Sequence, residues 1–367
     1  MLNLRVVQAR YGDCFILENG AARSRKYILV DGGPSKVYGP YLRAELEAIA
    51  SRGGKLDLMV LSHIDNDHVR GLLEFMRDLR KAREQGQPPL IRVEQIWHNG
   101  FSKILPPELE ETAAELEHET ALEVVPDPDL PLSEQLEESY GVAEGHELQV
   151  SDVELGIPRN PGFDDQRITL ESAVKPVKIG GVKFWVIGPT VANLERLRER
   201  WVEWLMRKNL PFAPGEKPVR PDEAVNNLSS IMFLAEAGKR RFLMTGDGVS
   251  ADIVAGLEAA GLLKKEGTLR VDVLKVPHHG SARNTVGALF DRVLADTYLI
   301  SGDGRYDNPD SQTLNWIVDA ACRQERDIHI FATNMAPSIK TLLRERPPEQ
   351  NRYILTVMPK WQSSALL

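Results

Sequence analysis

Short apolar runs, each bounded by glycine or other turn-forming residues, dominate the first hundred residues of the chain. Runs of this kind are typical of β-strands. They predict strands at Leu2–Gln8, Asp13–Glu18, Lys26–Val30, Leu56–Leu61 and Ile91–Trp97. Between Val69 and Glu84 the apolar residues instead recur three and four positions apart, which predicts an amphipathic helix. Tyr41–Ala50 is a second helical segment.

The polar face of the helix predicted at Val69–Glu84 is basic, with Arg70, Arg77, Arg80 and Lys81. Charged residues on one face of an amphipathic helix usually face water. We therefore interpret this face as solvated rather than as a binding surface.

The second half of the chain alternates between the two patterns. Strands are predicted at Val182–Ile187, Ser230–Ala235, Arg241–Met244, Val271–Val276, Thr297–Ile300 and Ile328–Ala332. Helices are predicted at Ala192–Lys208, Ala251–Ala260, Val286–Leu294 and Ser311–Arg323. Strands followed by this alternation indicate a layered α/β protein.

Charge is distributed unevenly. The segment Ile104–Pro158 contains 16 Asp and Glu and no Lys or Arg, with a helix expected at Glu108–Glu123 and a Pro-rich loop at Val124–Leu132. The chain has a net charge of −8, yet the rest of it, with 37 acidic and 45 basic residues, carries +8. A basic body is compatible with a nucleic-acid partner. The acidic segment is either a solvated insertion or an arm that covers or mimics the path of an anionic substrate.

Composition excludes several classes of protein. Hydrophobic residues make up 42% of the chain, enough for a sizeable core, but no run of about 18 apolar residues could span a membrane. The first residues lack the pattern of a secretory signal. Cys14 and Cys322 are too few for a disulfide framework. We expect a cytoplasmic protein without a membrane partner, and the oligomeric state is left open.

The densest polar cluster follows the predicted strand Leu56–Leu61 and reads Ser62-His63-Ile64-Asp65-Asn66-Asp67-His68. Side chains in an extended chain repeat every two residues, so His63 and Asp65 share one side. The turn into the next helix would bring Asp67 and His68 to the same place. Imidazole and carboxylate groups are metal ligands, and the cluster predicts a metal site.

Three more apolar strands end in side chains of the same type. Asp31 follows Ile28–Val30, Asp247 follows Phe242–Met244, and His278 and His279 follow Leu274–Val276. Open α/β sheets form their sites just beyond the carboxyl ends of strands. We therefore expect these residues to meet at one edge.

The order of these elements resembles the metallo-β-lactamase-fold superfamily of metal-dependent hydrolases, whose signature is Asp, HxHxDH, a separate His, Asp and a last His. The finer motifs SHxDxDHxxGL, NNxSxxxxL, TGD and VPHHGS are similar to the extracellular hydrolase domain of ComEC-like DNA-uptake proteins and their soluble relatives. In this chain they are Ser62–Leu72, Asn226–Leu234, Thr245–Asp247 and Val276–Ser281. Ser301-Gly302 and Asn308-Pro309 match a late segment of that family.

The resemblance implies an α/β (α+β) fold, a four-layer αββα sandwich. The hydrolase domain would comprise residues 1–335, with the acidic insertion at about 104–158. Residues 336–367 would form an extension packed on the same domain.

The resemblance also implies roles for the matching residues. His63 and Asp65 would bind a first metal ion, while Asp67, His68 and His278 would bind a second and Asp247 would bridge both. His98, after Ile91–Trp97, is the best candidate for the separate third histidine, with a structural or substrate-contacting role as the alternative.

The remaining candidates are supporting residues. Asp31 would support the ligand shell, and His279 would orient a ligand or contact substrate. Asn227 and Ser281 are candidates for hydrogen bonds to substrate. The catalytic residues would be Asp67, Asp247 and His279.

Asp65 departs from the superfamily signature, which has histidine there. A carboxylate is a harder ligand than an imidazole, so it moves the metal preference of the first site from zinc toward manganese or magnesium. Zinc accepts mixed nitrogen and oxygen ligands and suits the second site. The expected cofactors are one or two divalent ions, Zn²⁺ or Mn²⁺, with Mg²⁺ as a further candidate.

Paired divalent ions can activate a water at neutral pH and hold a substrate oxyanion. The favoured function is accordingly a phosphodiesterase or nuclease acting on nucleic acid or nucleotides. The alternative is a hydrolase of a lactone, thioester or β-lactam-like molecule, although Asp65 and the missing secretion signal count against the β-lactamase branch. A purely structural metal site is a third reading, which the nearly complete ligand set disfavours.

Overall fold

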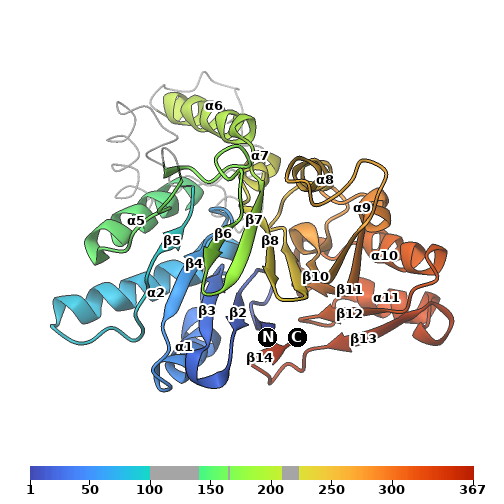
Figure 1. Cartoon of the computed structure of the whole chain (residues 1–367), viewed down its shortest axis with the longest axis horizontal. Helices are drawn as coiled ribbons and strands as arrows, with labels where there is room; N and C mark the ends of the chain where they lie inside the picture. The colour runs from blue at the N-terminus through green and yellow to red at the C-terminus, as the bar shows by residue number, and fades with distance from the viewer. Residues whose placement is uncertain (100–139, 164–165, 209–222) are drawn as a thin grey trace.

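The computed structural model describes residues 1–99, 140–163, 166–208 and 223–367 (Figure 1). Two β-sheets pack face to face, and helices cover both outer faces, so the predicted four-layer αββα sandwich is confirmed. The strands are β1 Leu2–Val7, β2 Phe15–Asn19, β3 Lys26–Val30, β4 Leu56–Val60, β5 Ile96–Trp97, β6 Val177–Ile179, β7 Val182–Gly188, β8 Met232–Ala237, β9 Arg240–Met244, β10 Leu269–Lys275, β11 Val293–Ile300, β12 Ile328–Ala332, β13 Tyr353–Val357 and β14 Ser364–Leu366. The helices are α1 Arg43–Ala50, α2 Asn66–Glu84, α5 Tyr140–Leu155, α6 Val191–Lys208, α7 Glu223–Leu228, α8 Ser250–Ala259, α9 Gly287–Arg292, α10 Ser311–Arg323 and α11 Pro337–Glu345.

Alternating side chains divide the core into three layers. In β2, Phe15 and Leu17 face the other sheet, whereas Ile16 faces the helices, as the two-residue period of a strand requires. The central layer between the sheets contains the aromatic residues Trp97, Phe184, Phe233 and Phe242. The outer layers lie under α1 and α2 on one side and under α8 to α11 on the other. Each sheet is thus buried on both faces.

Sheet order brings the predicted site together. The six-stranded sheet runs β14-β1-β2-β3-β4-β5, and the eight-stranded sheet runs β13-β12-β11-β10-β9-β8-β7-β6. β3, β4 and β5 are parallel, as are β9 through β13. The carboxyl ends of β3, β4, β9 and β10 carry the polar clusters identified from the sequence. This arrangement is the one that forms sites beyond strand ends.

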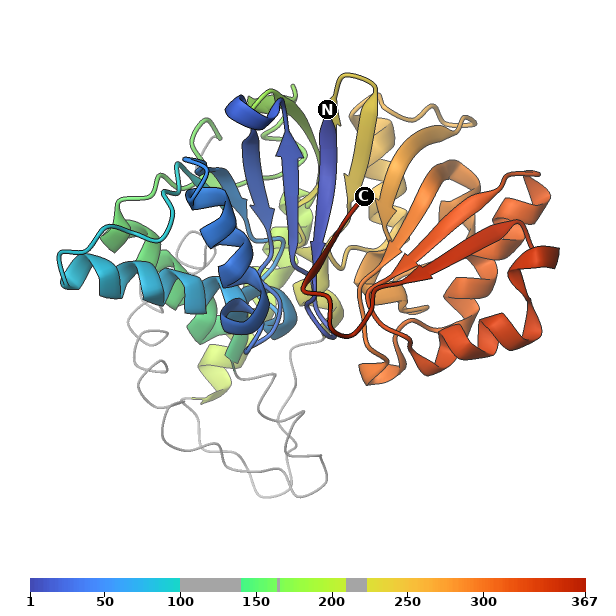
Figure 2. The same cartoon turned by 90° about the horizontal axis from the view of Figure 1, so that it is seen from below.

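The last residues of the chain contribute to both sheets. β13 pairs in parallel with β12, and β14 pairs antiparallel with β1. Figure 2 shows the red C-terminal segment running beside the blue N-terminal strand, between the two halves of the molecule. Residues 336–367 therefore supply one helix and an edge strand of each sheet.

The basic face of α2 is solvated only in part: Arg77 and Lys81 are exposed, whereas Arg70 and Arg80 are half-buried. α5 lies alongside α2 (Figure 1), and Arg70 pairs with Glu144. Arg77 pairs with Glu147 and Arg80 with Glu154, both with N–O separations of 2.5 Å. The end of the acidic segment is therefore compensated by arginines that lie 70 residues or so earlier in the chain.

α5 also contributes to the core, since Leu148 is fully buried in the layer beneath α2. Leu148→Ala should lower the free energy of unfolding by about 2–4 kcal/mol, because it leaves a cavity in a packed layer. Urea denaturation would measure this loss. The control Val153→Ala, at a side chain that is 71% exposed on the same helix, should change stability little. Equal stability of the two variants would show that α5 is a dispensable appendage.

The strand predicted after α2 is shorter in the structure. The strand predicted at Ile91–Trp97 is limited to Ile96–Trp97, preceded by an isolated bridge between Leu56 and Val93. The helix expected at Glu108–Glu123 and the loop expected at Val124–Leu132 lie outside the described residues. Within the described ranges, no helix is long and apolar enough to cross a membrane.

Candidate metal centre

Four side chains from three strand ends converge between the sheets. Asp67 and His68 open α2, Asp247 follows β9, and His279 follows β10. One ligand atom from each of these residues lies within 4.8 Å of the others, which makes them a candidate metal-binding group. The shortest contacts are 3.0 Å from His279 Nε2 to Asp67 Oδ2 and 3.3 Å from His68 Nε2 to Asp247 Oδ1. We call this group the second donor set.

Beside it lies a smaller group, the first donor set, made of His63, Asp65 and the shared Asp247. His63 Nε2 is 3.4 Å from Asp65 Oδ2 and 3.9 Å from Asp247 Oδ2. Asn226 donates a hydrogen bond of 2.9 Å to Asp65 Oδ1, which fixes the carboxylate so that its other oxygen faces His63. Asp247 therefore contacts both donor sets.

The second donor set contains His279, which the sequence analysis expected to orient a ligand or contact substrate and to be catalytic, rather than to bind a metal. His278 and His279 both have positive φ, 47° and 52°. Two consecutive left-handed residues bend the chain so that both imidazoles face Asp247 Oδ2, at 3.7 Å from His278 Nε2 and 3.4 Å from His279 Nε2. His279 is buried, whereas the side chain of His278 is 23% exposed. The expected assignment of these two histidines is thus corrected, since His279 is the one that meets Asp67 and His68.

The histidine nitrogens that face the donor sets fit a cation. His63 Nε2, His68 Nε2 and His279 Nε2 are buried without a hydrogen-bond partner in the described chain. His279 Nδ1 lies 2.7 Å from the carbonyl oxygen of Ser301, so Nδ1 carries the hydrogen and Nε2 presents a lone pair. Lone pairs and carboxylate oxygens pointing at one another are unfavourable unless a positive charge lies between them. The residues present therefore fit divalent metal binding.

The pKa values of the ionisable groups in the cluster also reflect its excess of negative charge. Burial disfavours a charge on His68, but Asp247, Asp67 and Asp31 outweigh it and raise the pKa of His68 well above its ordinary value. Burial acts in the opposite sense on Asp247, whose pKa is nevertheless held well below its ordinary value by His279, His68 and Lys275. The carboxylate is ionised and surrounded by groups that compensate it.

Asp31 supports His68 from behind, as the sequence suggested. One carboxylate oxygen lies 2.9 Å from His68 Nδ1, and the other accepts a hydrogen bond of 2.7 Å from the backbone nitrogen of Ser62. A carboxylate that holds the outer nitrogen of a histidine fixes its tautomer and leaves the inner nitrogen available to a metal. Asp31 is therefore a positioning residue.

Sequence reasoning missed two buried charges next to Asp247. Lys275, the last residue of β10, is fully buried, and its Nζ lies 2.7 Å from Asp13 Oδ2 and 3.2 Å from Asp247 Oδ1. It also donates 2.8 Å to the carbonyl oxygen of Gly246. Asp13 in turn contacts His279 and the Ser301 hydroxyl. The available signal was a lysine inside an apolar strand, which is rarely buried unless it is paired.

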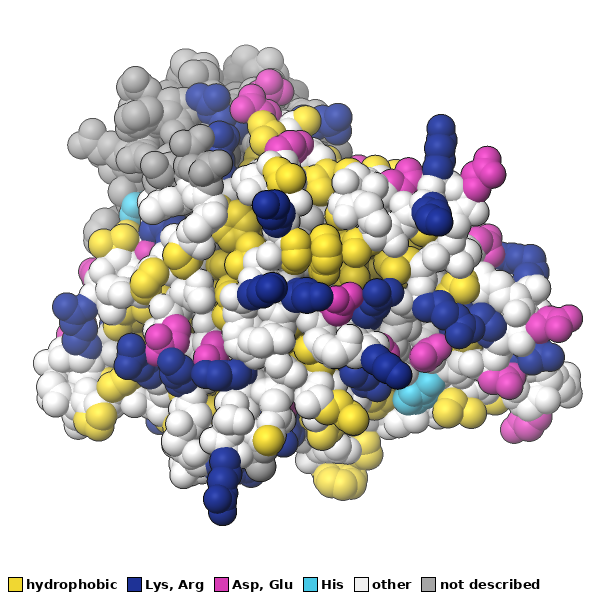
Figure 3. All heavy atoms as spheres, viewed as in Figure 1, with side chains coloured by type: hydrophobic (Ala, Val, Ile, Leu, Met, Phe, Trp, Pro, Cys, Tyr) yellow, Lys and Arg dark blue, Asp and Glu magenta, His cyan; other side chains and the backbone are white. Residues whose placement is uncertain are grey.

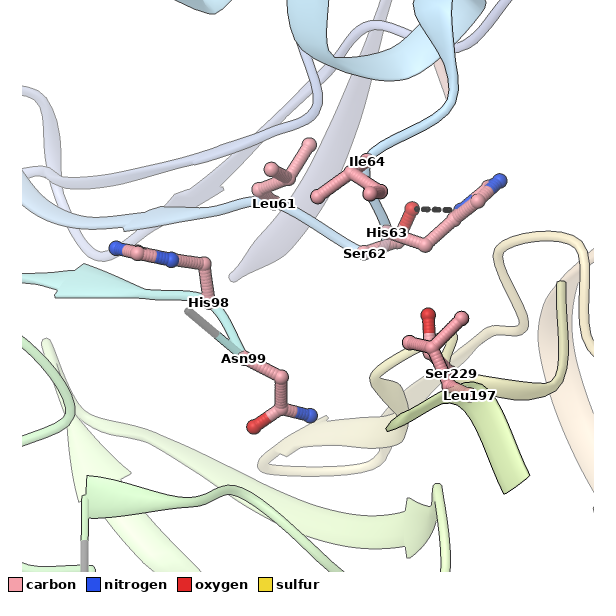
Figure 4. A pocket seen from close by; sticks show the side chains of 8 residues that line it. All are labelled: Leu61, Ser62, His63, Ile64, His98, Asn99, Leu197 and Ser229. Atoms are coloured by element: carbon pink, nitrogen blue, oxygen red, sulfur yellow. Dashed lines mark hydrogen bonds between the residues drawn. The ribbon is translucent and has the colours of Figure 1, made fainter. Parts of the chain in front are cut away.

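His98 does not join either donor set, so the structure does not support its expected role as a metal ligand. Its Nε2 lies 2.8 Å from Asp152 Oδ2, and Arg159 contacts both oxygens of that carboxylate. Figure 4 shows the His98 ring turned away from His63, on the far side of the pocket that both residues line. Burial lowers the pKa of His98 although Asp152 opposes the shift, so the imidazole is neutral and donates to Asp152. The structural alternative holds.

His98→Ala should accordingly leave the metal content per chain unchanged while lowering the free energy of unfolding by about 1–3 kcal/mol, because Asp152 loses a buried hydrogen bond. Elemental analysis of the purified variant and urea denaturation would measure the two quantities. His63→Ala is the matched comparison, in which metal content should fall. Loss of metal from His98→Ala would restore its role as a ligand.

The two remaining candidates, Asn227 and Ser281, lie at the edge of the donor sets. Asn227 Nδ2 is 3.5 Å from His278 Nδ1, and that same nitrogen lies 2.8 Å from Asn284 Oδ1. The hydroxyl of Ser281 accepts a hydrogen bond from the backbone nitrogen of Arg283, which stabilises its own loop. Asn226, the neighbour of the predicted Asn227, contacts Asp65 of the first donor set.

Comparison with known proteins agrees with this geometry. The family model for the metallo-beta-lactamase superfamily matches residues 7–132. ComE operon protein 3 of Bacillus subtilis (strain 168) is 27% identical over 140 residues, which are 35% of this chain and 15% of that protein. The chain thus spans a small part of this relative's length. The match supports the ComEC-like branch suggested by the motifs.

Two solved structures align along the chain with low similarity. The metallo-beta-lactamase fold protein YhfI from Bacillus subtilis aligns over 100% of this chain and 99% of its own, with 11% identity and a TM-score of 0.40. A CmlA beta-hydroxylase E377D mutant aligns over 100% of this chain and 53% of its own, with 12% identity and a TM-score of 0.37.

The strand-end donor sets, the αββα sandwich and the match over residues 7–132 lead to one conclusion. Residues 7–132 match the metallo-beta-lactamase superfamily, and this match together with the donor sets indicates a metal-dependent hydrolase that is similar to the ComEC-like proteins.

Proposed function

We propose that this hydrolase is a phosphodiesterase acting on nucleic acid or nucleotides. The observation that carries the proposal is the position of Asp247, a single carboxylate shared by two donor sets. Its Oδ1 lies 3.3 Å from His68 Nε2, and its Oδ2 faces His63 Nε2 at 3.9 Å. A carboxylate between two groups of ligands suits a pair of cations, and paired cations suit the displacement of a phosphodiester oxygen.

His278 completes the first donor set in this proposal. Without His98, the first set has one imidazole and one carboxylate besides Asp247 in the described chain. His278 Nε2 lies 3.7 Å from the same Asp247 oxygen that faces His63. The first site would then be His63, Asp65 and His278, and the second would be Asp67, His68 and His279. Both would share Asp247.

The proposed ligands set the metal preference. Each site would combine two imidazoles with two carboxylates, one of them shared, and such mixed sets accept manganese as well as zinc. We propose Mn²⁺ or Zn²⁺, with Mg²⁺ as a further candidate. When bound, the ions would neutralise a phosphodiester and make a water available as a nucleophile near neutral pH. The protein would contribute positioning: Asp31 orients His68, Asn226 orients Asp65, and Lys275 holds Asp247.

Two further observations support a nucleic-acid substrate. The motifs of the donor sets are similar to those of the ComEC-like hydrolase domain, and outside Ile104–Pro158 the chain has a net charge of +8. On the face seen in Figure 3, Lys and Arg side chains are spread among Asp and Glu rather than gathered into one patch.

The test compares substrate classes on one preparation. Protein stripped with a chelator and reloaded with Mn²⁺, Zn²⁺ or Mg²⁺ would be assayed on bis(p-nitrophenyl) phosphate, a lactone and a thioester. Single-stranded DNA, duplex DNA and RNA would follow. We expect hydrolysis of the phosphodiesters, highest with Mn²⁺ and absent after chelation.

A control keeps the site intact while changing a carboxylate elsewhere. Asp327→Asn, on an exposed loop, should retain wild-type rates on every substrate. A value of kcat/KM for the lactone or thioester at least tenfold above that for the phosphodiester would favour the small-molecule alternative and reject the proposal.

A further inference from the structure

An aromatic and basic group lies on two loops whose other residues contact the second donor set. Arg305 places its guanidinium carbon 4.0 Å from the ring centroid of Tyr11. The Tyr306 ring meets that of Tyr11 edge to face, with centroids 6.4 Å apart and planes at 86°. We call Tyr11, Arg305 and Tyr306 the stacking platform. Tyr306 is 52% exposed, so part of its ring is open to solvent.

Both loops of the stacking platform are close in sequence to residues that contact the second donor set. Tyr11 is two residues from Asp13, whose backbone nitrogen donates 3.1 Å to the carbonyl oxygen of Asp67. Arg305 is four residues from Ser301, whose carbonyl oxygen is 2.7 Å from His279 Nδ1. Both loops therefore begin at contacts with the second donor set.

A polar network holds the two loops together. Asn334 Nδ2 donates to the carbonyl oxygen of Arg10 at 3.0 Å and to that of Gly302 at 3.2 Å. Gly302 also donates its backbone hydrogen to Thr333 Oγ1 at 3.1 Å. The platform is therefore organised before any ligand arrives, which lowers the entropy lost on binding.

The loop that carries Arg305 and Tyr306 has an unusual backbone conformation. Gly304, Tyr306 and Asp307 all have positive φ, at 97°, 56° and 63°. A Cβ added at Gly304 would meet Pro337 Cδ at 2.8 Å, so the loop packs closely against the start of α11. Bulky residues are rare in the left-handed region, so surrounding contacts must hold the backbone of Tyr306 in this conformation.

We propose that the stacking platform binds a nucleobase of single-stranded nucleic acid whose phosphate is placed at the donor sets. This inference rests on the proposed phosphodiesterase function and names the substrate form that the site would select. Aromatic rings and the planar guanidinium of arginine both stack on bases, and they do so with little preference for sequence. Duplex ends and interiors keep their bases stacked on one another, so an unpaired base is the partner that fits.

Basic and acidic side chains near the stacking platform are equal in number. Arg10 and Arg305 are matched by Asp303 and Asp307, and Asp303 accepts a hydrogen bond of 3.0 Å from the backbone nitrogen of Arg305. The platform should thus contribute stacking and little net attraction for phosphate. Its removal should leave the salt dependence of binding nearly unchanged, because that dependence follows the number of phosphate contacts.

The test uses metal-loaded full chain and two fluorescent phosphorothioate oligonucleotides of twelve units, one of thymidines and one abasic. We expect the wild type to bind the thymidine strand more tightly than the abasic strand. Tyr306→Asn should weaken binding of the thymidine strand about tenfold, the cost of one stacked base, and leave the abasic strand unaffected. Asparagine tolerates positive φ, so this change removes the ring without straining the loop.

Tyr306→Trp is the matched control and should keep the preference for the thymidine strand, while Arg305→Lys, which retains charge but loses the planar group, should reduce it. Circular dichroism would verify that each variant is folded. Equal affinity of the wild type for the two strands, or equal weakening of both by Tyr306→Asn, would overturn the platform and leave the phosphodiesterase proposal standing. Failure of the wild type to bind either strand would reject both.

Discussion

Asp247→Asn is expected to abolish nearly all hydrolysis, by about 100-fold or more, while the fold is retained. Asparagine has the same shape as aspartate but lacks the charge that faces four histidines. Metal-ion catalysis contributes several kcal/mol, and each 1.4 kcal/mol lost is a tenfold reduction in rate. The rate on bis(p-nitrophenyl) phosphate and the metal content per chain, measured by elemental analysis, should fall together.

This result would distinguish a shared carboxylate from a ligand of one ion. If Asp247 serves both donor sets, the variant should lose metal from both, whereas Asp65→Asn should lose metal from the first set only. Circular dichroism would show that the sheets are intact in each variant. Activity of Asp247→Asn within about threefold of the wild type, with unchanged metal content, would disprove the shared role.

Lys275→Met should lower the free energy of unfolding of metal-free protein by about 3–5 kcal/mol, because removal of one member of a buried charge cluster leaves the others unpaired. Lys275 is fully buried against Asp13 and Asp247. Burial works against its charge, but the two carboxylates raise the pKa of Lys275, so the ammonium is retained at neutral pH. Urea denaturation after chelation would measure the loss.

A second substitution separates charge from packing. Asp13→Asn in the Lys275→Met background removes one of the uncompensated charges and should recover a good part of the lost stability. Lys340→Met, an exposed position on α11, provides a control that should be nearly neutral. A double variant no more stable than Lys275→Met would mean that the methionine fails for steric reasons and that charge compensation is not the role of Lys275.

The residues of this site that could be predicted most directly from the sequence are those that lie in one loop. His63, Asp65, Asp67 and His68 are contiguous, and the strand before them fixes which way they face. Asp31, Asp247 and His279 were found because each follows an apolar strand, and parallel strands present their carboxyl ends at one edge. Local pattern and sheet topology were sufficient for these residues.

The errors concern residues whose partners are distant in sequence. His98 looks like a ligand until Asp152, 54 residues later, is seen to hold its Nε2. The arginines of α2 look solvated until α5 is placed beside them. The entry of His279 into the second donor set depends on the positive φ angles of His278 and His279, which no spacing rule reveals. In each case the deciding quantity is a tertiary contact or a backbone conformation.

The pairing of β1 with β14 affects the order in which the chain acquires its site during synthesis. Arg5 and Ser364 are in contact although 359 positions separate them, so the six-stranded sheet remains incomplete until β14 has been made. Asp13, just before β2, likewise pairs with Lys275 and Ser301, which are made much later. Contacts of such long range slow folding, because loop closure costs entropy before contacts form. On the ribosome, a nascent chain would carry the His63–His68 loop through the synthesis of β5 to β8 before Asp247 and His279, which complete the second donor set, are made.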